Sequence, residues 1–143
     1  GYWNTGNRNT GCLNTGTPKL RIFNRETDVQ FEDVEFPDYF WFDLTEWIQE
    51  HEMTDKEKED NPTFKITGGY LKVYRYKEAW RKSWDSATDE DRRKTLRLPN
   101  WDNAIFLEIT GIDVEKELAV ADNATRETVI KSLKNNVRTC KKQ

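Results

Sequence analysis

The chain opens with a short tandem repeat, which constrains its fold more than any other sequence feature. Residues 1–16 read GYWNT-GNRNT-GCLNT-G, so Asn-Thr-Gly returns every five residues, at Asn4, Asn9 and Asn14. A period of five matches neither the helical turn nor the two-residue alternation of a strand. It is typical of a chain that winds in a square coil with one repeat on each face. Glycine then permits the tight corners, and stacked asparagines can form hydrogen-bonded ladders.

Three repeats are too few to close such a coil. Four faces require about 20 residues, and a single turn cannot bury its own inner face. We therefore expect the segment to pack against further coils, against a second copy of the chain or against the domain that follows. Five residues are the candidate partner contacts: Trp3, Asn4, Asn9, Leu13 and Asn14. A flexible Gly/Asn linker is the alternative interpretation.

Composition predicts one compact domain after the repeat. The chain has 143 residues, of which 34% are charged, but 13% are aromatic, including six tryptophans, which is enough bulky apolar surface for a core. We expect a pentapeptide-repeat β-coil fragment over residues 1–19, followed by an α+β domain over residues 20–143. That domain should be mainly helical with a small β-sheet.

The two cysteines and the absence of apolar runs bear on where the protein works. Cys12 and Cys140 stand at opposite ends of the chain, which favours two free thiols in a reducing cytoplasm over a disulfide framework or a zinc site. We expect no signal peptide, and the sequence has no apolar run long enough to span a bilayer. These features predict a cytoplasmic protein without membrane contact.

Local patterns predict most of the secondary structure. Asp43 followed by Glu46 resembles a capping box and predicts a helix over 43–51, and Thr54 with Glu57 predicts a short helix that ends before Pro62. Alternation predicts strands over 20–23 and 70–74, whereas 27–38 fits either a strand or a helix. Further helices are expected over 76–86, from Ser86 or Thr88 to Pro99, from Asp102 to Gly111 and over 125–137.

Charge is distributed unevenly along the chain. Residues 1–25 carry a net charge of +4, residues 26–60 carry −12, and residues 61–143 carry +5. Such asymmetry marks either a binding surface or an acidic stretch that folds back on the basic ones. We favour the second interpretation.

No residue pattern indicates catalysis. The single histidine, His51, stands between two glutamates that point in different directions, and no serine or cysteine occupies a nucleophile-elbow context. Gly68-Gly69 lacks the lysine of a phosphate-binding loop. We therefore predict that the chain is not an enzyme and uses no cofactor or metal.

Two stretches have a composition suited to binding. The first, residues 70–84 (YLKVYRYKEAWRKSW), interleaves aromatic rings with cations, as single-stranded nucleic-acid sites do. Its candidate contacts are Lys72, Arg75, Lys77, Arg81 and Lys82. The same spacing also separates an aromatic face from a basic one, so we favour rings in the core and cations in water.

The second stretch is acidic and spans residues 26–60. An array of carboxylates can imitate a phosphate backbone and occupy a nucleic-acid-binding protein. The candidate mimic residues are Asp28, Glu32, Asp33, Glu35 and Asp38. A solvated acidic face is the favoured alternative.

The repeat, the run KITGGYLKVYRYKEAWRKSWDSA and the segment LRLPNWDNAIFLEITGI together resemble pentapeptide-repeat-containing proteins of bacteriophages and prophages. The resemblance covers residues 1–114, and 68–73 and 98–102 carry most of it. It implies a small phage-derived protein in the cytoplasm of a bacterial host cell, with no catalytic residues to transfer. We therefore predict a non-catalytic binding or assembly module with a protein partner, which includes homo-oligomers. A counter-defence inhibitor and a nucleic-acid-binding protein are the alternatives.

Overall fold

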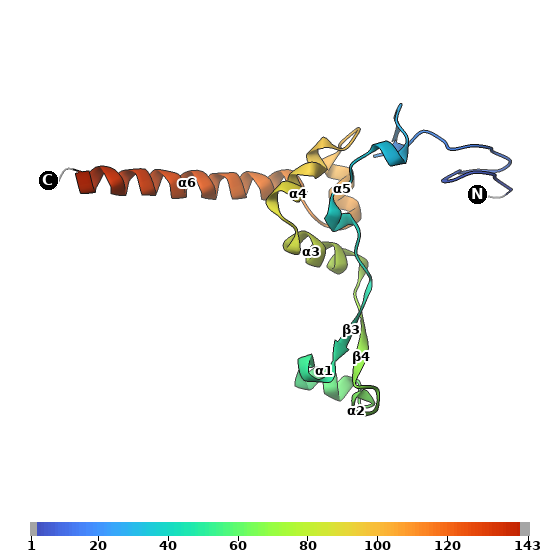
Figure 1. The fold of residues 1–143 in the computed structure, drawn as a ribbon, viewed down its shortest axis with the longest axis horizontal. Coiled ribbons are helices and arrows are strands. Elements are labelled where there is room, and N and C mark those ends of the chain that lie inside the picture. The colour runs from blue at the N-terminus through green and yellow to red at the C-terminus, as the bar shows by residue number, and fades with distance from the viewer. Residues whose placement is uncertain (1–2, 141–143) are drawn as a thin grey trace.

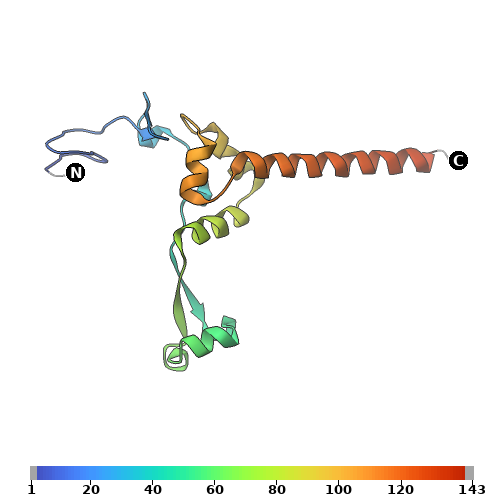
Figure 2. The same ribbon diagram turned by 180° about the vertical axis from the view of Figure 1, so that it is seen from behind.

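The protein has a small core from which three segments project (Figure 1). The computed structural model describes the backbone of residues 3–140 and the side chains of residues 3–134. The projecting segments are the N-terminal repeat, a ribbon of two strands with two short helices at its tip, and the last helix (Figures 1 and 2). The architecture is α+β, as the sequence predicts, with two separate two-stranded sheets in the described part.

Aromatic side chains build the core. Helices α3 (Tyr76–Ser86) and α5 (Asn103–Thr110) pack together with the start of α6 (Val114–Cys140) and a 3₁₀ turn at Asp38–Phe40. The buried cluster consists of Tyr39, Trp80, Trp84, Phe106, Ile112, Val114 and Leu118. Most of its ring pairs meet edge to face, the arrangement that the ring quadrupole favours.

Most predicted helix ends around the core are confirmed, but the helix expected to reach Pro99 ends at Lys94 and is followed by a 3₁₀ turn at Thr95–Arg97. Helix α4 (Asp89–Lys94) begins after Thr88, whose hydroxyl accepts a hydrogen bond from the Asp91 N–H. The Asp102 carboxylate caps α5, and Gly111 ends it in the left-handed conformation at φ 78°. These signals work because each satisfies backbone groups that a helix end leaves unpaired.

The predicted helix over 43–51 is wrong. Residues Thr45–Gln49 form strand β3, which pairs antiparallel with β4 (Gly69–Val73) and is followed by a 3₁₀ turn at Glu50–Glu52. The segment is rich in β-branched and aromatic residues, and the partner strand supplies the backbone hydrogen bonds that a helix would have made internally. Helices α1 (Asp55–Asp60) and α2 (Phe64–Thr67) join the two strands, and Thr54 and Glu57 form the predicted capping box of α1.

Two other boundaries differ from expectation. Helix α6 begins at Val114 rather than at 125, because Val114 and Leu118 already place an apolar stripe against the core. The strand expected over 20–23 is reduced to β1 (Arg21–Ile22), which pairs with β2 (Arg25–Glu26). Within 27–38 the regular structure is a 3₁₀ turn at Phe31–Asp33 and the start of the turn at Asp38–Phe40, so neither a strand nor an α-helix forms there.

The pentads have a regular backbone, but not that of a square coil. The residue before each asparagine has positive φ, and so do Gly6, Gly11 and Gly16. Contacts join residues ten apart: the Asn14 N–H donates to Asn4 Oδ1 at 2.8 Å, and a Cβ placed on Gly6 would lie 2.1 Å from the Gly16 carbonyl oxygen. The chain therefore returns on itself after two pentads, where one repeat per square face would require four. The described residues show no closed β-coil.

Candidate functional site

The β3–β4 ribbon carries a network of charged side chains on one face. The Tyr70 hydroxyl donates to a Glu57 carboxylate oxygen at 2.6 Å, and the Lys72 ammonium donates to the same oxygen at 3.1 Å. The hydrogen bond from Tyr70, followed by those from Thr54, lowers the pKa of Glu57 to about 2. This face lies against α1, and its polar side chains have hydrogen-bond partners there.

Nearer the core, the same face holds a second carboxylate. Glu46 accepts hydrogen bonds from the Lys82 ammonium and the Tyr74 hydroxyl, and these bonds lower its pKa. Lys82 belongs to α3, so this contact joins the ribbon to the core. The Glu46 side chain, which resembled a helix cap in the sequence, thus anchors a strand.

The opposite face of the ribbon is apolar and bare. Side chains alternate between the two faces of a strand, so Trp47 and its cross-strand partner Leu71 share one face with Val73. Their exposed fractions are 49%, 55% and 70%. The Trp47 indole also covers Gly69, because a Cβ added there would lie 3.0 Å from its Nε1 atom. We call Trp47, Leu71 and Val73 the bare face, and it is the candidate site.

Two of the three residues of the bare face were predicted from the sequence. The alternation over 70–74 placed Leu71 and Val73 on one side of a strand, but Trp47 was assigned to a helix. The missing signal was the run of β-formers Thr45, Trp47 and Ile48, which competed with a capping-box pattern.

The predicted basic stretch is largely neutralised in the folded chain. Lys72 and Lys82 bind the two ribbon carboxylates, and Arg81 donates to Glu117 at 2.5 Å and to Asp85 at 2.6 Å. Of the five candidate cations, Arg75 and Lys77 make no ion pair with the residues described.

Four of the five aromatic residues of that stretch are also engaged. Trp80 and Trp84 are buried at 8% and 2% exposure, and the Tyr70 and Tyr74 hydroxyls bind carboxylates. Two of the rings thus serve the core and two serve the ribbon. The fifth, Tyr76, is 51% exposed and stands in the sequence between Arg75 and Lys77, which are also exposed.

The acidic stretch folds back in part. Glu32 lies 3.5 Å from Arg8, and Glu35 lies 3.0 Å from Lys94, while Asp33 accepts a hydrogen bond from the Gln30 backbone. The other two candidate mimic residues, Asp28 and Asp38, are exposed. The five carboxylates therefore do not form one free acidic array.

The candidate contacts in the pentads divide into two kinds. The three asparagines bond to backbone carbonyls of neighbouring pentads: Asn4 to Gly11, Asn9 to Thr5 and Gly16, and Asn14 to Thr10. Trp3 and Leu13, ten residues apart, are 79% and 77% exposed. Between them in sequence, Arg8 stacks its guanidinium 3.2 Å from the centre of the Phe31 ring, which ties the repeat to the following segment.

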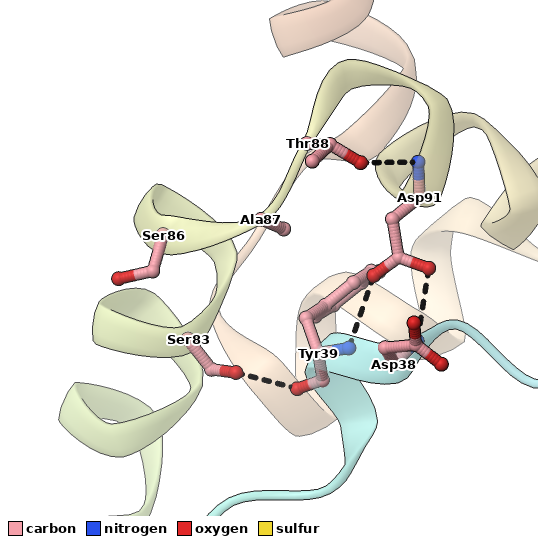
Figure 3. A pocket seen from close by; sticks show the side chains of 7 residues that line it. All are labelled: Asp38, Tyr39, Ser83, Ser86, Ala87, Thr88 and Asp91. Carbon is pink, nitrogen blue, oxygen red and sulfur yellow. Dashed lines mark hydrogen bonds between the residues drawn. The ribbon is translucent and has the colours of Figure 1, made fainter.

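The core borders a cavity of about 270 Å³, shown in Figure 3. Its polar groups serve the fold. The Asp91 carboxylate accepts the backbone N–H groups of Asp38 and Tyr39 at 2.9 and 3.1 Å, and Ser83 donates to the Tyr39 carbonyl at 2.6 Å. The Tyr39 hydroxyl is paired with Thr95 at 2.6 Å, and burial raises its pKa. The serines of this cavity therefore lack the adjacent general base that a nucleophile needs.

No group of three or more metal-ligating side chains is present among the residues described. The His51 imidazole is exposed in the turn that follows β3. Within the same limits, no helix has the length and apolar character needed to cross a membrane. Comparison with protein-family models, curated proteins and solved structures finds no match.

Proposed function

We propose that the chain is a non-catalytic protein-binding or assembly module. The observation that carries this proposal is the bare face of the ribbon. A two-stranded ribbon is only marginally stable by itself in water, and here just one of its faces is covered. Apolar side chains left uncovered on a projecting element are typical of a protein interaction site.

The repeat belongs to the same proposal. Its contacts between residues ten apart support a partial β-coil that winds once every two pentads. The exposed Trp3 and Leu13 side chains extend the apolar surface that the module offers. By the sequence resemblance, we also propose a phage or prophage origin and a cytoplasmic location in the bacterial host.

The two alternatives have less support. Direct nucleic-acid binding requires free cations near stacking rings, but Lys72, Arg81 and Lys82 are paired with carboxylates. A nucleic-acid mimic requires an unpaired acidic array, but Glu32 and Glu35 lie beside cations. Ion pairs of this kind reduce the charge that either surface presents.

A ribbon variant tests the proposal. Leu71→Thr with Val73→Thr keeps β-forming side chains while it reduces the apolar surface at two of the three bare-face positions. We expect the wild-type protein to form a complex, with itself or with a protein from host lysate, that this variant loses. Light scattering after size exclusion and affinity capture with both proteins as bait provide the measurements.

Ile66→Thr is the matched control, because Ile66 is 89% exposed and lies on α2 outside the bare face. Binding should survive this change. The proposed function would be contradicted if the wild-type chain stays monomeric and captures the same proteins as the ribbon variant.

A further inference from the structure

The last helix provides a second apolar surface without a partner in the described chain. Helix α6 is anchored at its start, where Val114 and Leu118 are buried and Glu117 accepts from the Trp84 indole at 2.7 Å. Every side chain from Ala119 to Lys134 is exposed. We call residues 119–134 the shaft; Figures 1 and 2 show it leaving the core as a straight rod.

Three of the four large apolar residues of the shaft share one side, whereas Val120, which is 61% exposed, lies on the opposite side. Val129, Ile130 and Leu133 are 52%, 49% and 60% exposed. Their spacing of three and four residues places them on one helical stripe. Most helices in proteins are stabilised by packing of their apolar face, so such a stripe is expected to pack against another surface.

The stripe and the bare face match in shape and charge. One helical turn from Val129 to Leu133 rises about 6 Å, close to the step from Leu71 to Val73 along a strand. The shaft has three basic and two acidic residues, whereas residues 43–74 have eight acidic and four basic ones.

Unpaired charges also border each surface. Arg126 and Lys134 flank the stripe, and Asp43 and Glu50 lie at the two ends of β3. Within the described side chains, none of these four makes an ion pair. Each surface therefore offers the other both apolar contact and opposite charge.

The two surfaces cannot meet within one chain. The shaft and the ribbon leave the core in different directions (Figures 1 and 2). The shaft is continuous with the anchored first turns of α6, so it cannot fold back onto the ribbon without breaking the helix. A second copy of the chain removes this conflict, because its shaft approaches from outside.

We propose that two copies exchange shafts, each laying the Val129–Leu133 stripe across the bare face of the other. This inference rests on the proposed assembly function and names its partner as a second copy. The exchange is reciprocal and has twofold symmetry, the commonest symmetry of soluble oligomers. Each dimer then covers both stripes and both bare faces. A contact between two shafts would leave the bare faces exposed, and a contact between two ribbons would leave the stripes exposed.

Disulfide trapping tests the exchange. Cys12 and Cys140 are first replaced by serine. One chain then carries Thr45→Cys, which is exposed and directly opposite Val73 on the ribbon, and a second chain with a mass tag carries Val129→Cys. Cysteine packs as a small hydrophobe, so the stripe is little disturbed. We expect oxidation of the mixture to give a cross-linked pair of one tagged and one untagged chain.

Lys131→Cys is the matched control for the shaft. It lies two residues from Val129, on the far side of a helix with 3.6 residues per turn, and should not cross-link to the ribbon. Cross-links only between two Val129→Cys chains, only between two Thr45→Cys chains, or in no mixture would overturn the proposal.

Charge reversal provides a second measurement that does not depend on cysteine. Arg126→Glu with Lys134→Glu should weaken the dimer about tenfold at low salt, and Asp43→Lys with Glu50→Lys on the same chain should restore it. An unchanged dimer, or a loss without restoration, would count against the exchange; circular dichroism checks that the helices remain. If the ribbon variant loses a complex but no ribbon-to-shaft cross-link forms, the exchange fails while the binding function stands.

Discussion

The core and the ribbon use the same kinds of residue with opposite outcomes. Around α3, Trp80 and Trp84 are buried and packed edge to face with other rings. On the ribbon, Trp47 and Leu71 form a cross-strand pair that is half exposed. The difference lies in the number of layers, because the core encloses its rings on several sides and the ribbon is covered on one. The presence of an aromatic residue therefore does not by itself show whether its side chain stabilises the fold or forms part of a binding surface.

The largest effect should follow from removing a core ring. Trp84→Ala deletes a side chain that is 2% exposed and leaves a cavity, which should lower the free energy of unfolding by about 3–5 kcal/mol. Chemical denaturation followed by circular dichroism measures this change. Trp41→Ala, at a residue that is 67% exposed, should cost far less. Equal losses at the two positions would contradict the contrast between covered and bare rings.

A smaller loss should follow from removing the carboxylate beneath the 3₁₀ turn. Asp91→Ala leaves the backbone N–H groups of Asp38 and Tyr39 without their acceptor, which should cost about 1–3 kcal/mol. Asp91→Asn retains one acceptor oxygen and should recover part of the loss. The same denaturation experiment compares the two variants. If alanine and asparagine behave alike, the carboxylate does not act through these two hydrogen bonds.

These regions also differ in how much the sequence revealed. Helix ends near the core were predicted correctly because Thr88, Asp102 and Gly111 act on backbone groups within a few residues of themselves. The ribbon was missed in part because β3 depends on pairing with residues 20 to 28 positions away. The pattern from Asp43 to Glu46 fits the capping box of a helix, but pairing with β4 makes this segment a strand. The bare face, built from both strands, could not be assembled from local patterns.

Acid should weaken the ribbon through Glu57. The pKa of Glu57 lies at about 2 in the folded chain, below the ordinary glutamate value of 4.5. A lowered folded pKa means that the stabilisation is present above pH 4.5 and is lost as the pH falls toward 2. Nuclear magnetic resonance of the Trp47 indole N–H through this range should report local loosening of the ribbon. In Glu57→Gln the charge is already absent, so this pH dependence should flatten. An unchanged profile would mean that Glu57 does not contribute to the stability of the ribbon.

The smallest effect on stability should come from the residues with the largest effect on binding. Leu71→Thr with Val73→Thr replaces side chains that are more than half exposed, and threonine favours a strand, so each change should alter the free energy of unfolding by no more than about 0.5 kcal/mol. Denaturation of a dilute sample, in which assembly is suppressed, measures the fold alone. A loss as large as that of Trp84→Ala under these conditions would mean that the ribbon face is packed within one chain. Near-unchanged stability together with lost assembly would instead show that its apolar surface acts between molecules.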